Sequence, residues 1–452
     1  MERKYENIYF LGIGGIGMSA LARYFLHEGY SVAGYDLTAT PLTRALESEG
    51  AAVHYEDDPE QIPAKMRNKE NTLVVLTPAI PSDHKEWAWL RAEGFTIEKR
   101  SQMLGHLSSG KVVMAVAGTH GKTTTSTLAA WLNHAAAKEG SAFLGGISRN
   151  FNSNLVLGCG NRLVVEADEY DRSFLRLYPD VAVITATDAD HLDIYGDEAH
   201  IRAAFKGFAS QVSGIVIAKY GIDITPADTQ AKIMTYSFGD PRADFYAEPV
   251  GDEGHFNLHY PGGVIEDCVV GIPGWVNIEN ATGASAIGLA YGLDPQKIKA
   301  ALATFSGVKR RFDLQVRRPD CVYIDDYAHH PEEISAALSS IKKAYPSMKL
   351  TAAFQPHLYT RTRDFAEEFA QALSNVDKLI LLEIYPAREE PIPGVTSEII
   401  FKDVTAPEKV LLKRADFMEY MEKEEVELFV TLGAGDIDRF VGPIAEMLSQ
   451  RK

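Results

Sequence analysis

The chain has 452 residues, of which 46% are hydrophobic and 24% are charged, and its formal net charge is −17 at pH 7. A chain of this length is too long to fold around one compact core, so we predict about three domains. The excess of acidic residues argues against a nucleic-acid partner, because a polyanion would be repelled. The three cysteines lie far apart and no apolar run is long enough to cross a bilayer, so we expect a cytoplasmic protein with no zinc knuckle, disulfide framework or membrane span.

The first hundred residues alternate short apolar strands with amphipathic helices. Residues 8–11, 31–35 and 73–76 are predicted strands, and residues 18–28 form a predicted helix. Strand–helix alternation of this kind is typical of a parallel, doubly wound sheet. We therefore predict an N-terminal Rossmann-like domain over residues 1–108.

A glycine-rich turn follows the first predicted strand and matches G-x-G-x-x-G. Its backbone can approach a diphosphate closely, and the helix that it opens offers unpaired N–H groups. An acid follows the second strand at the spacing expected of a ribose ligand. The motif alone fits NAD, another nucleotide diphosphate such as a UDP-sugar, or glycines that serve only a tight turn. The candidate residues are Gly12, Gly14, Gly15, Ile16, Gly17 and Asp36.

A second unit opens with a predicted buried strand at residues 112–117, followed by a second glycine-containing turn and a threonine-rich helix. Backbone amides of this turn can cradle phosphates, Lys122 can neutralise β and γ oxygens, and the Thr123 hydroxyl can reach Mg²⁺. The loop is shorter than the strict Walker pattern, which has glycine where this chain has Val116. The alternative is a simple turn with a solvated lysine. The candidate ATP residues here are Gly118, Thr119, His120, Gly121, Lys122, Thr123 and Thr124.

The strand–helix alternation continues to the end of the chain. We predict a central P-loop-type ATP-binding domain over residues 109–308, with a parallel sheet and a small β-meander, and a second Rossmann-like domain over residues 309–452. No short-period repeat occurs. The predicted elements are strands at residues 163–165 and 181–184, the meander at 240–270, a helix at 278–291, and strands at 322–324, 350–354, 379–382 and 427–432.

Two phosphate-binding loops on successive domains narrow the possible functions. A dehydrogenase would need only the first loop, and a plain ATPase would need only the second. Together they predict an ATP-consuming reaction on a substrate that itself carries a diphosphate.

From the second loop onward the chain resembles the Mur ligase superfamily, which adds amino acids to the peptidoglycan precursor. The glycine run at residues 12–17 and a Phe-Gln-Pro-His block favour the branch that joins L-alanine to UDP-N-acetylmuramate over the branch that attaches a ready-made tripeptide. The motifs that carry the resemblance are Glu-Ala-Asp-Glu-Tyr-Asp at 166–171, Asp-Ala-Asp-His-Leu-Asp at 188–193, Asn-Ile-Glu-Asn at 277–280, Arg-Arg-Phe-Asp at 310–313, Asp-Asp-Tyr-Ala-His-His-Pro at 325–331, and Phe-Gln-Pro-His with Thr-Arg-Thr-Arg across 354–363.

The resemblance implies an acyl-phosphate mechanism with ATP and Mg²⁺. The muramoyl carboxylate attacks the γ-phosphoryl group of ATP, and the alanine amine then displaces phosphate. Thr123, Glu166 and His191 resemble the metal ligands of the family, with a phosphate or water contact as the alternative for His191. Arg311 and Asn277 resemble residues near ATP, and Asp326 resembles the acid that holds the ribose. The implied catalytic set is Lys122, Glu166, His191 and Arg311.

Tyr327, His329 and Arg361 fall where the family binds alanine. Val276 stands where the family has a histidine, and Leu358 stands where it has a second arginine, so clamping of the alanine carboxylate rests on Arg361. Lys206 lies near the position of a carbamylated lysine in some relatives, and we expect an ordinary surface lysine.

Three other functions fit part of the sequence. An NAD-dependent oxidoreductase leaves the second loop unexplained, and a folate polyglutamylating enzyme shares the central domain but not the N-terminal one. A non-catalytic sensor of UDP-muramoyl precursors would be favoured by loss of Lys122 or Glu166, and both are present. We expect a monomer or weak homodimer whose partners are ATP, UDP-N-acetylmuramate and L-alanine.

Overall fold

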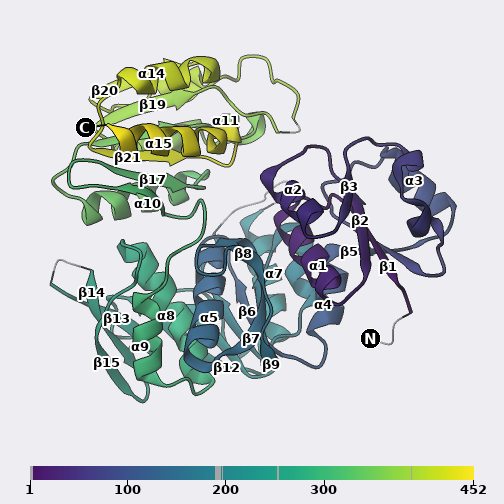
Figure 1. Ribbon diagram of the computed structural model, residues 1–452. Coiled ribbons are helices and arrows are strands. Elements are labelled where there is room, and N and C mark those ends of the chain that lie inside the picture. Colours follow the sequence, from purple (N-terminus) through teal and green to yellow (C-terminus); the bar gives the residue numbers. More distant parts are fainter. Residues whose placement is uncertain (1–3, 189–194, 196, 252–253, 388, 452) are drawn as a thin grey trace. The chain divides into compact units, whose positions relative to one another are not determined.

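The computed structural model describes residues 4–188, 195, 197–251, 254–387 and 389–451 (Figure 1). Three sheets with flanking helices give the three-domain α/β fold that the sequence predicts. The chain forms two compact units, of which the first comprises residues 1–248, 258–265 and 280–302 and the second comprises residues 249–257, 266–279 and 303–452.

The N-terminal sheet has five parallel strands in the order β3-β2-β1-β4-β5. Successive side chains of a strand point to opposite faces, so Phe10 packs with the core on one face and Tyr9 with the core on the other. The strands are β1 (Asn7–Leu11), β2 (Ser31–Tyr35), β3 (Ala52–His54), β4 (Thr72–Leu76) and β5 (Thr96–Lys99), and the helices are α1 (Ile16–His27), α2 (Pro41–Ser48), α3 (Lys85–Ala92) and α4 (Arg100–Ser108).

The strand order of this sheet reverses at β1. The chain passes from β1 to β2 on one side and later to β4 on the other, so the carboxyl end of β1 lies at a topological switch point. Ligands of doubly wound sheets bind in the crevice at such a point. The glycine turn at residues 12–17 therefore starts where the topology favours a ligand.

The central sheet has ten strands in the order β15-β14-β13-β12-β11-β10-β6-β9-β7-β8 and is mixed, because β7 and β8 are antiparallel. Its strands are β6 (Val112–Ala117), β7 (Glu139–Ser148), β8 (Ser153–Val156), β9 (Cys159–Ala167), β10 (Val181–Ile184), β11 (Ile215–Lys219), β12 (Lys232–Phe238), β13 (Phe245–Val250), β14 (His255–Tyr260) and β15 (Gly263–Cys268). The helices are α5 (Lys122–Ala137), α7 (Glu198–Ser210), α8 (Trp275–Ala290) and α9 (Pro295–Ala303), and η3 (Tyr170–Arg176) is a 3₁₀ segment. The predicted meander at residues 240–270 is β13 to β15, which continue this sheet.

Parallel pairing sets the position of the second glycine turn (residues 118–121), which is the candidate ATP loop. Ala117 of β6 is in register with Ala167 of β9 and with Ile184 of β10. The loops that leave these three strands therefore start from one edge of the sheet. Acidic residues after β9 and polar residues after β10 are brought beside the glycine turn after β6.

Helix α1 packs against β7 and β8, so the N-terminal and central sheets share buried contacts within the first unit. The ring of Tyr24 lies 5.8 Å from that of Phe143, and Leu21 and Phe25 belong to the same buried cluster as Leu155. This packing holds the first glycine turn in the same compact unit as the candidate ATP loop.

The C-terminal sheet has the order β16-β17-β21-β18-β19-β20, with β16 antiparallel to its neighbour and the other pairs parallel. Phe354 packs on one face and Ala353 on the other. The strands are β16 (Asp313–Arg317), β17 (Val322–Asp326), β18 (Leu350–Phe354), β19 (Lys378–Leu382), β20 (Glu408–Leu412) and β21 (Leu428–Leu432). The helices are α10 (Pro331–Ala344), α11 (Tyr359–Asp364), α12 (Ala366–Leu373), α13 (Glu398–Phe401), α14 (Phe417–Lys423) and α15 (Val441–Gln450).

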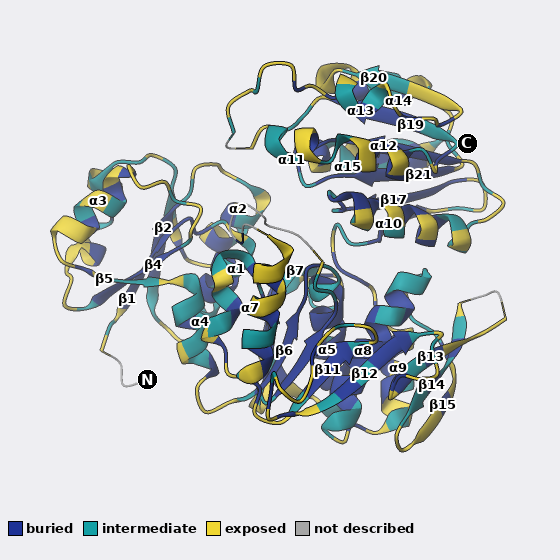
Figure 2. Ribbon diagram, turned by 180° about the vertical axis from the view of Figure 1, so that it is seen from behind, coloured by how far each residue is buried: buried dark blue, intermediate teal, exposed yellow. Residues whose placement is uncertain are grey.

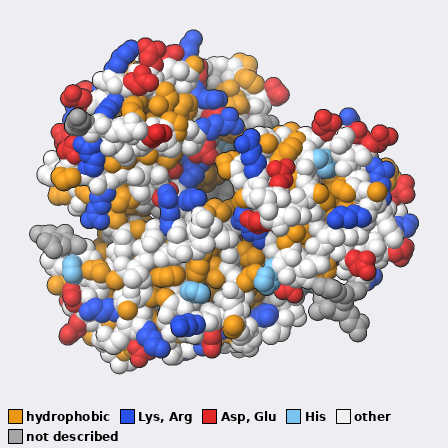
Figure 3. Space-filling model, in the orientation of Figure 1, with side chains coloured by type: hydrophobic (Ala, Val, Ile, Leu, Met, Phe, Trp, Pro, Cys, Tyr) orange, Lys and Arg blue, Asp and Glu red, His pale blue; other side chains and the backbone are white. Residues whose placement is uncertain are grey.

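The inner strands of the sheets are buried, and the helices that cover the sheets expose their outer faces to solvent (Figure 2). On the face seen in Figure 3, Lys and Arg side chains are interspersed with Asp and Glu side chains. Within the described ranges, no helix combines the length and the apolar composition that a bilayer span requires.

Candidate active site

The candidate ATP loop is a tight turn in which two positions require glycine. Gly118 has φ +139°, and a Cβ there would lie 2.8 Å from the amide nitrogen of Ala186. Gly121, at φ 79°, precedes α5 in the left-handed conformation. The amide of Thr119 donates to the Ala186 carbonyl at 3.1 Å. The start of α5 has no side-chain cap, so its first N–H groups remain available to phosphate oxygens.

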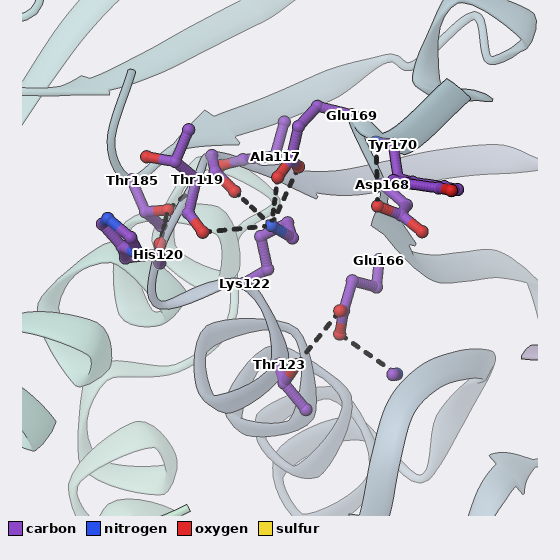
Figure 4. Close-up of polar contacts among 12 residues, drawn as sticks. Ala117, Thr119, His120, Lys122, Thr123, Glu166, Asp168, Glu169, Tyr170 and Thr185 are labelled. Atoms are coloured by element: carbon purple, nitrogen blue, oxygen red, sulfur yellow. Dashed lines mark hydrogen bonds and ion pairs between the residues drawn. The ribbon is translucent and has the colours of Figure 1, made fainter. Parts of the chain in front are cut away.

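Lys122 lies at the centre of this loop and is bonded on two sides (Figure 4). Its Nζ donates to the Gly118 carbonyl at 2.6 Å and lies 2.8 Å from Oε2 of Glu169. Burial lowers the pKa of Lys122, but the charges of Glu169 and Asp168 outweigh it and the pKa is raised. The lysine is therefore charged and is held between the Gly118 carbonyl and the Glu169 carboxylate.

Glu166, at the end of β9, meets the first turn of α5. One carboxylate oxygen accepts from the Thr123 hydroxyl at 3.0 Å, and the other accepts from the Ser126 hydroxyl at 3.2 Å and the Gly145 amide at 3.0 Å. A carboxylate beside a hydroxyl at a phosphate loop is the oxygen-donor set that suits Mg²⁺. His191, the third predicted ligand, lies outside the described residues.

The acids after Glu166 pair with cations from other parts of the first unit. Asp168 accepts from Arg100 at 3.0 Å, and Asp171 accepts from Lys99 at 2.8 Å. The structure therefore pairs these two acids with Arg100, the first residue of α4, and with Lys99, the residue before it.

Asparagine side chains at the start of α8 have different surroundings. Asn280 is buried and its Oδ1 accepts from Thr125 at 3.2 Å, beside the ATP loop. The side chain of Asn277, the residue that the resemblance implied, donates to the Pro273 carbonyl at 2.6 Å. Asn280, which belongs to the same motif and was not among the predicted ATP residues, is therefore the asparagine that contacts α5 through Thr125.

The first glycine turn is closed by Asp36. The amide of Gly14 donates to Oδ2 of Asp36 at 2.7 Å, and a Cβ on Gly14 would lie 2.8 Å from the same oxygen. Gly12 has φ +86° and packs against Thr77. Asp36 thus supports the turn from the end of β2, next to the N-terminus of α1.

In the second unit, Asp326 holds the turn that contains Arg311. Its carboxylate accepts from the Phe312 amide at 2.7 Å and from the Ala328 amide at 2.8 Å. Burial raises its pKa, although Arg311 acts in the opposite direction. The guanidinium of Arg311 lies 4.9 Å from the ring centroid of Tyr327.

The residues predicted to bind alanine gather in the second unit. The His329 Nδ1 lies 3.0 Å from the Tyr327 carbonyl, and burial lowers the pKa of His329 to about 4. Arg361 on α11 is close enough that its charge contributes to this lowering. The ring of His357 lies 6.2 Å from that of His329 and 5.8 Å from that of Tyr385. Tyr385, which follows β19 and belongs to none of the sequence motifs, was not among the predicted residues.

Lys206 is an ion-paired lysine on α7, 2.9 Å from Asp223 and 3.5 Å from Asp228.

Comparisons with known proteins cover nearly the whole chain. Residues 7–112 match the Mur ligase family catalytic domain, residues 116–288 the Mur ligase middle domain, and residues 310–436 the Mur ligase glutamate ligase domain. The UDP-N-acetylmuramate–L-alanine ligase of Phocaeicola vulgatus is 46% identical over 99% of both chains, and that of Parabacteroides distasonis is 47% identical over 99% of this chain and 98% of that protein.

Two solved structures resemble this chain over nearly its whole length. The UDP-N-acetylmuramate–alanine ligase of Thermotoga maritima has a TM-score of 0.84 at 27% identity, with 99% of this chain and 100% of that chain covered. A murein peptide ligase of Psychrobacter arcticus shares the fold, with a TM-score of 0.73 at 23% identity over 99% of both chains. The chain therefore belongs to the Mur ligase family.

Proposed function

We propose that this chain is an ATP-dependent ligase that joins L-alanine to the carboxylate of UDP-N-acetylmuramate in peptidoglycan synthesis. The products are UDP-N-acetylmuramoyl-L-alanine, ADP and phosphate. The observation that supports this most directly is the presence of two glycine turns, each between a strand and a helix, in one compact unit, with a cavity of about 80 Å³ whose lining includes both Gly17 and Glu166.

The first step activates the substrate carboxylate. A carboxylate does not acylate an amine in neutral water, because oxide is a poor leaving group. One carboxylate oxygen therefore attacks the γ-phosphorus of ATP, the bond between that phosphorus and the bridging oxygen breaks, and ADP leaves. Transfers of this kind depend on positioning and charge neutralisation.

Lys122 and the amides at the start of α5 are proposed to hold the phosphates of ATP. Lys122 would exchange its contact with Glu169 for the β and γ oxygens. Thr123 and Glu166 are the proposed Mg²⁺ ligands, with His191 as a third, and the bound ion would neutralise phosphate charge. In the second unit, Arg311, Asn277 and Asp326 are proposed ATP contacts.

The second step forms the amide. The neutral amine of alanine attacks the acyl carbonyl, a C–N bond forms, the C–O bond to phosphate breaks, and the nitrogen loses one proton, which the released phosphate accepts. Arg361 is proposed to bind the alanine carboxylate through two charge-assisted hydrogen bonds. Tyr327 and His329 are proposed to line the pocket, where a histidine with a pKa of about 4 is neutral at pH 7 and does not repel the amine.

Phosphate release from ATP, measured with UDP-N-acetylmuramate and Mg²⁺, tests the proposal. L-Alanine should support turnover, and the tripeptide L-alanyl-γ-D-glutamyl-meso-diaminopimelate should not. Substrate labelled with ¹⁸O in its carboxylate should transfer one ¹⁸O to the released phosphate, as an acyl phosphate requires. Turnover with the tripeptide alone would instead assign the chain to recycling, and UDP-N-acetylmuramate binding without turnover would assign it to sensing. We further propose that the protein acts in the cytoplasm as a monomer or weak homodimer.

A further inference from the structure

Arg100 connects the first glycine turn to the acidic segment that follows β9. It is the first residue of α4, and its Nη2 donates to Asp168 at 3.0 Å. The same guanidinium lies against α1, because a Cβ on Gly17 would overlap Nη1 and would lie 3.3 Å from Cζ. One cation therefore touches both the first turn of α1 and the loop that carries the ATP-site acids.

The cavity next to Arg100 has an unbalanced charge. It measures about 80 Å³, and its charged lining residues are Arg100, Glu166 and Asp168. Arg100 is the only cation among these lining residues, all of which the structure describes. An anion that enters this space meets two carboxylates, so its binding depends on the one guanidinium.

The ion pair between Arg100 and Asp168 is exposed enough for Arg100 to exchange Asp168 for another anion. The Arg100 side chain is 23% exposed and that of Asp168 is 33% exposed. A pair this open stabilises the fold by little, whereas a guanidinium matches two phosphate oxygens in a fixed fork. Asp168 thus holds Arg100 in position, and little free energy is needed for Arg100 to leave Asp168 and bind a phosphate instead.

We propose that Arg100 is a specificity-determining residue that exchanges Asp168 for the diphosphate of the nucleotide substrate. This assignment rests on the proposed function, which places a UDP-sugar at the turn of residues 12–17. Arg100 then recognises the second phosphate, and Asp168 is its counter-ion in the absence of substrate. The exchange forms and breaks ion pairs only, with no covalent change.

The other reading is a purely structural ion pair between α4 and the central domain. Arg23 is a matched control, because it lies on α1, bonds Glu49 at 2.8 Å and also reaches Asn154 of β8 in the central domain. Its side chain is 13% exposed, and it does not line the cavity. Arg23→Ala removes a contact between the same two domains without removing the proposed phosphate ligand.

The experiment compares UDP with uridine 5′-monophosphate by titration calorimetry on full-length wild type, R100A, R100K, D168N and R23A, with steady-state kinetics on each. R100A should weaken UDP binding tenfold or more, change uridine monophosphate binding less than threefold, and raise the KM for UDP-N-acetylmuramate but not for ATP. R100K should lose part of this affinity. D168N should bind UDP as well as wild type or better, because a competing anion is removed, and R23A should resemble wild type.

Three results separate the possible failures. Equal losses of UDP affinity in R100A and D168N would overturn the proposal in favour of a structural ion pair. Unchanged UDP affinity in R100A or, should that variant misfold, in R100K would also overturn it. If wild type neither binds UDP nor turns over UDP-N-acetylmuramate, the proposed function itself fails.

Discussion

Lys122→Ala removes one partner of a buried ion pair and should affect stability as well as catalysis. The Lys122 side chain is 14% exposed and that of Glu169 is 1% exposed. The substitution leaves the Glu169 carboxylate without its cation in a site where water has little access. It also removes the bonds from Nζ to the carbonyls of Gly118 and Thr119, at 2.6 and 3.3 Å.

Both effects have an expected size. Removal of one partner of a buried ion pair typically costs about 3 kcal/mol or more of unfolding free energy. Loss of one preorganised charge contact at a reacting phosphate raises the barrier by about 3 kcal/mol, which slows turnover roughly a hundredfold or more. The double variant Lys122→Met with Glu169→Gln removes both charges, so it should recover most of the stability but none of the activity.

Urea unfolding of the full chain and phosphate release at saturating ATP measure these two effects. Lys99→Ala is the matched control, because Lys99 pairs with Asp171 on the surface, where the two side chains are 52% and 34% exposed, and it should change neither quantity appreciably. Turnover of Lys122→Ala within twofold of wild type would refute its role at ATP. An unfolding midpoint equal to that of wild type would refute the stabilising role of the pair.

Three further predictions concern other sites. Glu166→Ala should raise the Mg²⁺ concentration needed for half-maximal turnover, because a proposed metal ligand is lost, and identical Mg²⁺ titrations for variant and wild type would contradict this. Arg361→Lys should raise the KM for alanine about tenfold, or about 1.4 kcal/mol, with little change for ATP; a variant that melts early but keeps the wild-type KM would place the pocket elsewhere. Burial raises the pKa of Glu86 from 4.5 to about 7, and Glu86 accepts from Tyr9 at 2.6 Å. The pKa of Glu86 in the folded protein thus lies above its pKa in the unfolded chain. Glu86 therefore makes its full contribution to stability below pH 4.5, and this contribution is lost as the pH rises through 7. Glu86→Gln should therefore flatten the pH dependence of urea unfolding between these values, and equal slopes for variant and wild type would count against it.

Much of the fold follows from local patterns. The strands predicted at residues 31–35, 112–117 and 181–184 have these bounds in the structure, because an apolar run that ends at a turn signal is a property of consecutive residues. Two glycines of the ATP loop have positive φ for the same local reason. The edge strand β8 and its neighbour β7 were not predicted, since their positions depend on β9, α1 and α5.

The side-chain partners depended on tertiary structure alone. The sequence by itself indicated candidate residues for ATP binding, but not that Asp168 pairs with Arg100, 68 positions away, or that Asp36 accepts from the Gly14 amide. Nor did it indicate that Asn280, rather than Asn277, bonds the ATP-loop helix through Thr125. The conformation of a glycine turn and the alternation of side chains along a strand depend on the backbone dihedral angles of a few consecutive residues. Residue types constrain these angles directly. The partner of a charged side chain is decided by how separate elements pack, here α4 against η3, and no local pattern encodes that contact.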